Sequence, residues 1–213
     1  MQRADEAVER AVRSFAAAMI SLAAHELNNR LAVMRETVGL LEDLARAGKS
    51  AAAGTARAHG SLDDQVGRAL NVVRTLGGLA GALGSGGGFD PGVAIGDLLG
   101  LTERWARQRS LRIEREIAAD LPRVDGDSAV FLCLVHRLLE RCAGAGQPGG
   151  SIRVRVVRAG EGILLQLAPT GGAEGAAVPA DDDETARELA LRLGGGLTFE
   201  GGGGATILLA AAH

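Results

Sequence analysis

Residues 21–31 read SLAAHELNNRL and lie in the middle of a long helical pattern. From about Ala4 to Ala47 the chain has neither a proline nor a glycine cluster that would end a helix. Its apolar residues recur at steps of three and four and form one stripe, made up of Val8, Val12, Phe15, Met19, Ala23, Leu27, Leu31, Met34, Val38 and Leu41. This spacing predicts one long amphipathic helix.

A second stripe with helical spacing follows a segment of small and polar residues. The segment Gly48–Gly60 is a plausible turn, and Ser61 followed by Asp64 is typical of a helix start. The glycine run Gly84–Gly88 is expected to end the second helix. Its apolar stripe comprises Leu62, Val66, Leu70, Val73, Leu76, Leu79 and Leu83.

Two helices joined by a short loop predict an antiparallel hairpin. One hairpin leaves most of its apolar stripe in water, whereas two hairpins paired in a four-helix bundle bury it. A homodimer is therefore expected.

After Phe89 the pattern changes from helical stripes to alternating helices and strands, which predicts a two-layer α/β domain. The chain is thus expected to be α+β, with a helical hairpin at 1–86 and an α/β domain at 87–213. Helices are expected at Val93–Arg107, Ser128–Ala143 and Asp182–Leu193, and strands around Ile113 and at Ile152–Val156, Ile163–Leu167, Leu197–Phe199 and Thr206–Leu209. The run Gly201–Gly204 lies between two strand signals and predicts a turn rather than a phosphate loop.

Composition excludes several classes of partner. The net charge is −3 and aromatic residues make up 2% of the chain, which argues against nucleic acid and anionic membranes. Cys133 and Cys142 are too far apart on one helix for a disulfide. The charged N-terminus and the short apolar stretch Phe15–Ala24 indicate neither a signal peptide nor a membrane anchor. A reduced, cytoplasmic protein without a metal site or bound cofactor is expected.

His25 is the candidate reactive residue. At 100° per residue the apolar stripe centres almost opposite His25, so its imidazole is expected to face solvent. A neutral imidazole is well populated near pH 7 and is a good nucleophile. Glu26 is suited to holding the ring tautomer and accepting a proton, and Asn29 to orienting a phosphoryl group or a water. The alternative is a surface histidine with no function.

The segment Leu22–Leu31 resembles the phosphoacceptor box of bacterial two-component sensor histidine kinases, commonly HELNNPL. The resemblance implies that His25 accepts the phosphoryl group, that Glu26 is its base and that Asn29 serves in phosphatase chemistry. The sequence departs from the family at Arg30, where proline is usual. This change should remove a helix kink, and with it any activity that depends on helix bending.

The remainder of the chain is similar in layout to the ATP-binding domain of those kinases, but its nucleotide residues differ. Arg137 and Arg141 stand where the family has asparagines that hold magnesium, and arginine has no lone pair to offer a metal. The segment Ala168–Gly172 lacks the aspartate that contacts adenine, and acidic residues open the Asp182 helix where phosphates would bind. A degenerate domain without ATP binding is expected. The two arginines are expected to form a solvated face rather than an anion site.

A phosphoacceptor hairpin with such a domain resembles the dimeric histidine phosphotransferases of the ChpT type. That resemblance implies transfer between His25 and the aspartyl phosphate of a receiver domain, with magnesium supplied by the receiver and a hybrid histidine kinase upstream. The receiver is expected to contact Asn28, Ala32, Val33 and Glu36, besides His25 and Asn29. Two alternatives stay open: a degenerate sensor kinase that acts mainly as a phosphatase through Asn29, and a non-catalytic dimeric adaptor.

Overall fold

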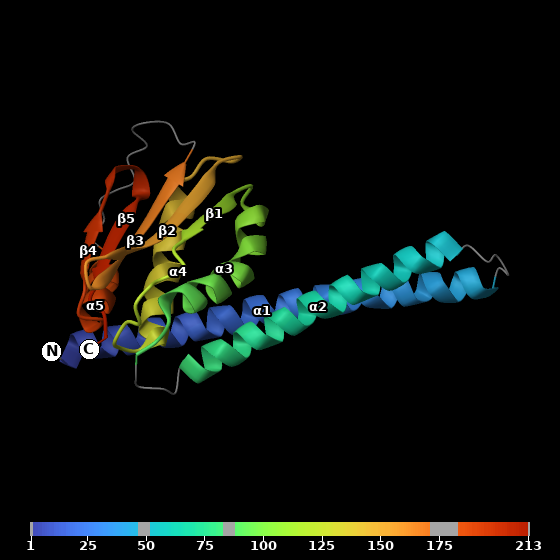
Figure 1. Ribbon diagram of the computed structural model, residues 1–213, viewed down its shortest axis with the longest axis horizontal. Coiled ribbons are helices and arrows are strands. Elements are labelled where there is room, and N and C mark those ends of the chain that lie inside the picture. The colour runs from blue at the N-terminus through green and yellow to red at the C-terminus, as the bar shows by residue number, and fades with distance from the viewer. Residues whose placement is uncertain (1, 47–51, 83–87, 171–182, 213) are drawn as a thin grey trace. The chain divides into compact units, whose positions relative to one another are not determined.

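The computed structural model describes residues 2–46, 52–82, 88–170 and 183–212. The chain divides into two compact units (Figure 1), a helical hairpin over Ala18–Gly77 and an α/β unit formed by Met1–Ala17 and Gly78–His213. Helix α1 (Gln2–Arg46) therefore contributes its first turns to the α/β unit and the rest to the hairpin. The boundary expected between residues 86 and 87 lies outside the described residues.

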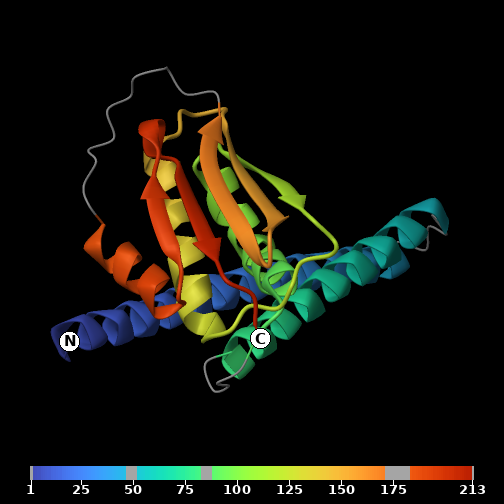
Figure 2. The same cartoon turned by 60° about the vertical axis from the view of Figure 1, so that its left-hand side comes forward.

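The α/β unit is a two-layer arrangement, as the sequence predicts (Figure 2). Among the described residues the sheet has the strand order β1-β2-β3-β5-β4, in which β1 and β2 are parallel and the other pairs antiparallel. Helices α3, α4 and α5 pack against the sheet. The bounds of these elements are α3 Pro91–Gln108, β1 Arg112–Ile117, α4 Ser128–Ala145, β2 Ser151–Ala159, β3 Gly162–Thr170, α5 Glu184–Arg192, β4 Gly196–Phe199 and β5 Ala205–Leu209.

Alternating burial along the strands explains why the sheet has one covered and one open face. In β2, Ile152, Val154 and Val156 are fully buried, whereas Arg153 and Arg155 between them are exposed. Because successive side chains of a strand point to opposite faces, the apolar set packs under the helices. The arginines lie on the open face, where they pair with Glu114 and Glu116 of β1. The short turn Gly201–Gly203 joins β4 to β5, as expected from the glycine run.

Helix α4 forms the centre of the core and holds His136, Cys133 and Cys142. His136 is buried, with its ring centroid 5.5 Å from that of Phe15 and 6.3 Å from that of Trp105. Burial lowers the pKa of His136, and Glu140, at 3.7 Å from Nδ1, partly opposes this effect. Both cysteines of α4 are free and buried, and burial raises the pKa of Cys133 to about 11 and that of Cys142 to about 12.

Helix α2 (Ala52–Ala82) begins earlier than the sequence indicated, so the turn expected over 48–60 is wrong from residue 52 onward, and the start expected at Ser61 is wrong. Residues 48–51 lie outside the described residues. Gly60 and Ser61 lie within the helix. The physical reason is that the alanine-rich segment before them has high helix propensity and packs as part of the hairpin, with Ala58 only 5% exposed. Tertiary packing and alanine content outweigh the local capping signal.

The apolar residues of the hairpin are only partly buried. The buried side chains within it are Met19, Ala23, Ala58, Val72 and Thr75. A second set stays exposed and comprises Ile20, Leu31, Val33, Val38, Leu40, Val66, Leu70 and Val73. The apolar stripe expected on α2 is therefore not buried as one set, because Val66, Leu70 and Val73 point away from the buried residues. No helix within the described ranges is long and apolar enough to cross a bilayer.

Candidate functional site

His25 lies in the part of α1 that belongs to the hairpin, and its side chain is exposed. This matches the orientation expected from the helical spacing. The residues expected to meet a receiver, Asn28, Ala32, Val33 and Glu36, are also exposed. The helix thus presents an exposed imidazole, and an accessible surface extends from it for about three turns toward the C-terminus of the helix.

Glu26, the residue expected to serve as the base, is held by an ion pair that the sequence analysis did not foresee. The guanidinium of Arg30 donates through Nη2 to Oε1 of Glu26, one helical turn away. Its Nη1 donates to Oε1 of Gln65 on α2, at 3.1 Å. The side chains of Glu26 and Arg30 are only 12% and 19% exposed. A Glu and an Arg four residues apart signal such a pair in any helix, but the contact with Gln65 depends on the register of the two helices.

Asn29 is placed differently from His25. The residue is half-buried, and its Nδ2 is buried without a hydrogen-bond partner among the described residues. The Nε of Arg30 is in the same situation. An amide that orients an attacking water must reach solvent, so the buried nitrogen of Asn29 is poorly placed for that task in the single chain.

The arginines of α4 for which a solvated face was expected make specific contacts. Arg137 donates through Nε to Oδ2 of Asp183, just before α5. The guanidinium of Arg141 lies over the ring of Phe199 in β4, 4.5 Å from its centroid, and that of Arg187 lies 5.4 Å from the same centroid. The expectation of a solvated arginine face is therefore wrong, because a carboxylate and an aromatic ring from two other elements engage these cations.

Asp183 has a second contact that bears on phosphate binding. Its Oδ1 accepts from the backbone N–H of Ala186, so Asp183 is the N-cap of α5. A helix N-terminus attracts phosphates through free backbone N–H groups and a positive dipole. Here a carboxylate already satisfies one of those donors and supplies negative charge.

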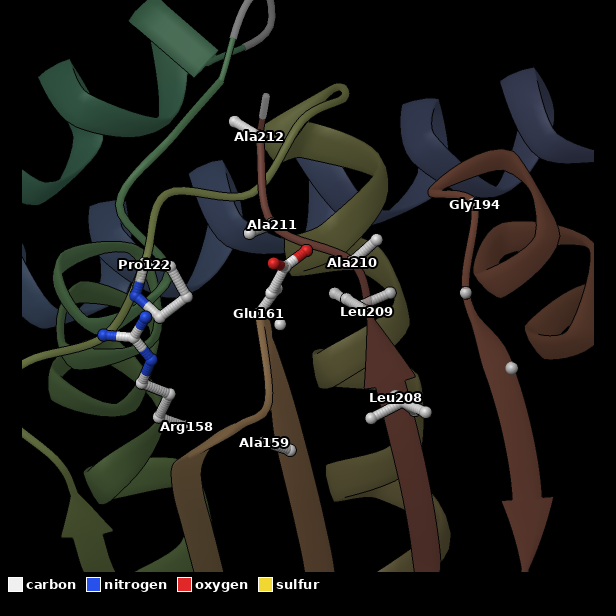
Figure 3. Close-up of a pocket in the computed structure, with 13 residues that line it drawn as sticks. Pro122, Arg158, Ala159, Glu161, Gly194, Leu208, Leu209, Ala210, Ala211 and Ala212 are labelled. Atoms are coloured by element: carbon white, nitrogen blue, oxygen red, sulfur yellow. The ribbon is translucent and has the colours of Figure 1, made fainter.

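A surface pocket in the α/β unit is a different kind of site (Figure 3). Its volume is about 630 Å³, and Arg158 and Glu161 are its charged residues. It includes Gly162, where β3 begins, whereas residues 168–170, the described part of the segment compared with the adenine box, form the other end of that strand. Glycine, alanine and leucine supply most of the remaining lining, so the pocket offers no nucleophile or metal ligand set. Within the described part of the chain no group of histidine, cysteine and acidic residues could hold a metal ion.

Comparison with known proteins identifies the fold. Neither a family model nor a curated protein matches the sequence. Among solved structures, the histidine kinase AdeS of Acinetobacter baumannii is similar with a TM-score of 0.50 and 16% identity, over 89% of this chain and 98% of that one. The cytoplasmic segment of the histidine kinase QseC matches with a TM-score of 0.45 and 14% identity, over 59% of this chain and 78% of that one. A mycobacterial sensor histidine kinase, MprB, matches with a TM-score of 0.45 and 19% identity, over 58% and 95%.

The similarity to AdeS shows that the chain has a histidine-kinase-like fold. At this level of identity the comparison concerns the fold alone, and function must come from the site.

Proposed function

We propose that this chain is a cytoplasmic, homodimeric histidine phosphotransfer protein, which relays a phosphoryl group between receiver aspartates through His25 and does not bind ATP. The observation that carries the proposal is the exposed imidazole of His25 midway along α1; in the sequence His25 directly precedes Glu26, whose carboxylate is shielded. A receiver domain can approach such a histidine, and a neighbouring carboxylate can accept its proton.

The proposed transfer is a nucleophilic displacement at phosphorus. The unprotonated ring nitrogen of His25 attacks the aspartyl phosphate of the receiver, an N–P bond forms and the P–O bond to the aspartate breaks. The aspartate leaves as a carboxylate with the electron pair of that bond. The proton on the other ring nitrogen passes to Glu26 or to water, which leaves phosphohistidine with an uncharged ring and an anionic phosphoryl group. Magnesium comes with the receiver, and the reverse sequence of steps phosphorylates the next receiver.

The exposed apolar residues of the hairpin support the homodimer. Eleven large hydrophobic side chains are exposed among the described residues, and eight of them lie on the hairpin. Leu31 and Val38 are two helical turns apart on α1, and Val66, Leu70 and Val73 follow steps of four and three on α2. Contiguous exposed apolar stripes of this kind mark an interaction surface. A second copy offers the same stripes, so two hairpins complete a four-helix bundle.

The contacts of Arg137, Arg141 and Asp183 support the absence of ATP binding. A cation stands at each position where a magnesium ligand would be needed, and Asp183 is tied both to Arg137 and to the N-terminus of α5. Nucleotide would have to displace these contacts and bring its own negative charge next to a carboxylate. In the proposal the α/β unit acts as a docking surface for the receiver.

Incubation with a phosphorylated receiver tests the proposal. We expect label to move to the wild-type chain, to be absent from His25→Ala, and to pass from the labelled chain to a second receiver. Release of free phosphate without labelled chain would instead support a phosphatase, and no reaction would support an adaptor.

Nucleotide binding is tested separately by calorimetric titration with ATP and magnesium. We expect no binding heat and no labelling of the chain from radioactive ATP. Labelling from ATP alone would show that the α/β unit retains kinase activity and would refute that part of the proposal.

A further inference from the structure

The ion pair between Glu26 and Arg30 differs from the other Arg–Glu pairs at the same spacing on α1. Glu9 and Arg13 are also four residues apart, but their side chains are 66% and 78% exposed. The corresponding values for Glu42 and Arg46 are 61% and 69%. Exposed pairs of this kind contribute little, because water screens the charges and the side chains remain mobile. The pair beside His25 is the shielded one of the three.

Shielding makes the two partners depend on each other. When one member of a buried pair is removed, the other is left as an uncompensated charge, and it must then move toward water or lose its charge. Without Arg30, the carboxylate of Glu26 would therefore leave its present position. Because Glu26 directly follows His25 in the helix, that movement would change the surroundings of the imidazole.

Gln65 extends the contact to the second helix. The guanidinium has two outer nitrogens in a fixed, planar arrangement, and one contacts Glu26 while the other contacts Gln65. The carboxylate on α1 is thereby fixed with respect to α2. A lysine at position 30 could pair with Glu26, but its single ammonium lacks the planar pair of donors that reaches both acceptors.

We infer that Arg30 is a positioning residue for phosphoryl transfer, which acts through Glu26 and uses Gln65 as its anchor on α2. In its presence the carboxylate that directly follows His25 in the helix is held in one place. Arg30, which stands where the kinase box usually has proline, thus also holds Glu26 in place with respect to α2. The inference rests on the proposed function, since a positioned base matters only if His25 is phosphorylated.

The experiment measures how fast His25 is phosphorylated in the full-length chain. Potassium phosphoramidate, a small-molecule donor for histidine, is used alongside a phosphorylated receiver, and rates are followed from pH 5.5 to 8.5. The variants are Arg30→Met, Arg30→Lys and Gln65→Leu. Arg13→Met is the matched control, because it removes an arginine from the exposed pair with the same spacing. Circular dichroism records whether each variant keeps its helices.

A positioned base contributes roughly 100-fold or more to proton transfer, so its displacement should cost a measurable part of that. We expect Arg30→Met to slow labelling by phosphoramidate about tenfold at neutral pH and to change the shape of the pH profile. The labelling rate of Arg30→Lys should lie between those of Arg30→Met and the wild type. The rate of Gln65→Leu should be about two- to fivefold below that of the wild type, because the ion pair remains but its contact with α2 is lost. The control should stay within about twofold of the wild type at every pH.

A folded Arg30→Met chain with the wild-type rate and the wild-type pH profile would overturn the inference. If that variant does not fold, Gln65→Leu tests the positioning role of Arg30, because it leaves both charges in place. An unchanged labelling rate in Gln65→Leu would equally count against that role. If phosphoramidate labels His25 but no receiver does, the proposed function fails while the rates with phosphoramidate still decide the role of Arg30. If neither donor labels His25 in the wild type, both proposals are wrong.

Discussion

Truncation of the exposed leucines of the hairpin should separate the proposed dimer without unfolding the chain. Leu31 on α1 is 57% exposed and Leu70 on α2 is 58% exposed, so both can be shortened with little loss of packing in a single chain. In a symmetric dimer each of these leucines occurs twice. The double variant Leu31→Ala/Leu70→Ala therefore removes four side chains from the proposed interface.

The size of the effect follows from the apolar surface that remains to be buried. Full burial of a leucine side chain contributes about 2.5 kcal/mol, and a little over half of that surface is still exposed here, which leaves about 1.4 kcal/mol for each leucine. Four leucines then account for about 6 kcal/mol of dimer stability. Since each 1.4 kcal/mol changes Kd tenfold, the double variant should raise the dimer Kd by more than about a thousandfold.

Sedimentation equilibrium over a range of protein concentrations measures this Kd directly. Val93→Ala is the matched control, because Val93 is 63% exposed but belongs to α3 in the α/β unit. We expect the control to associate like the wild type, and the helix content of the double variant to match it. A double variant that keeps the wild-type Kd would show that these stripes do not form the interface.

Three further predictions concern stability and reactivity. Burial lowers the pKa of His136, so as the pH falls the unfolded chain binds a proton at this histidine before the folded chain does. The contribution of His136 to stability should therefore be constant above the ordinary histidine pKa of about 6.5 and fall below it. His136→Gln should reduce the change in melting temperature between pH 7 and 5. Because thiolates are the reactive form and burial raises the pKa of Cys133 to about 11 and of Cys142 to about 12, a thiol reagent should label neither at pH 8 until denaturant unfolds the chain. Gly60→Ala should stabilise the chain by about 1 kcal/mol, seen as a higher urea midpoint, because Gly60 is helical and an added Cβ would meet nothing within 4 Å. A lower midpoint would instead favour the turn first expected there.

The periodicity of the sequence was sufficient to predict most helices and strands of the α/β unit. Helix and strand patterns differ in period, and the segments around Ile113, Ile152 and Ile163 fell where β1, β2 and β3 occur. These elements are long enough, and half-buried enough, for one-dimensional spacing to reveal them. At the start of α2 the same approach failed, since a serine with an acidic residue three positions later occurs inside helices as well as at their ends.

The sequence by itself determined that His25 lies on one long helix and faces solvent: spacing alone places it opposite the apolar stripe, because every residue of an α-helix turns by the same angle. It also placed Arg137 and Arg141 where the resemblance to histidine kinases would have asparagines. Only the tertiary structure decided what surrounds these positions. The contact of Arg30 with Gln65, and those of Arg137 and Arg141 with Asp183 and Phe199, join residues far apart in the chain, and no local pattern fixes the register that brings them together.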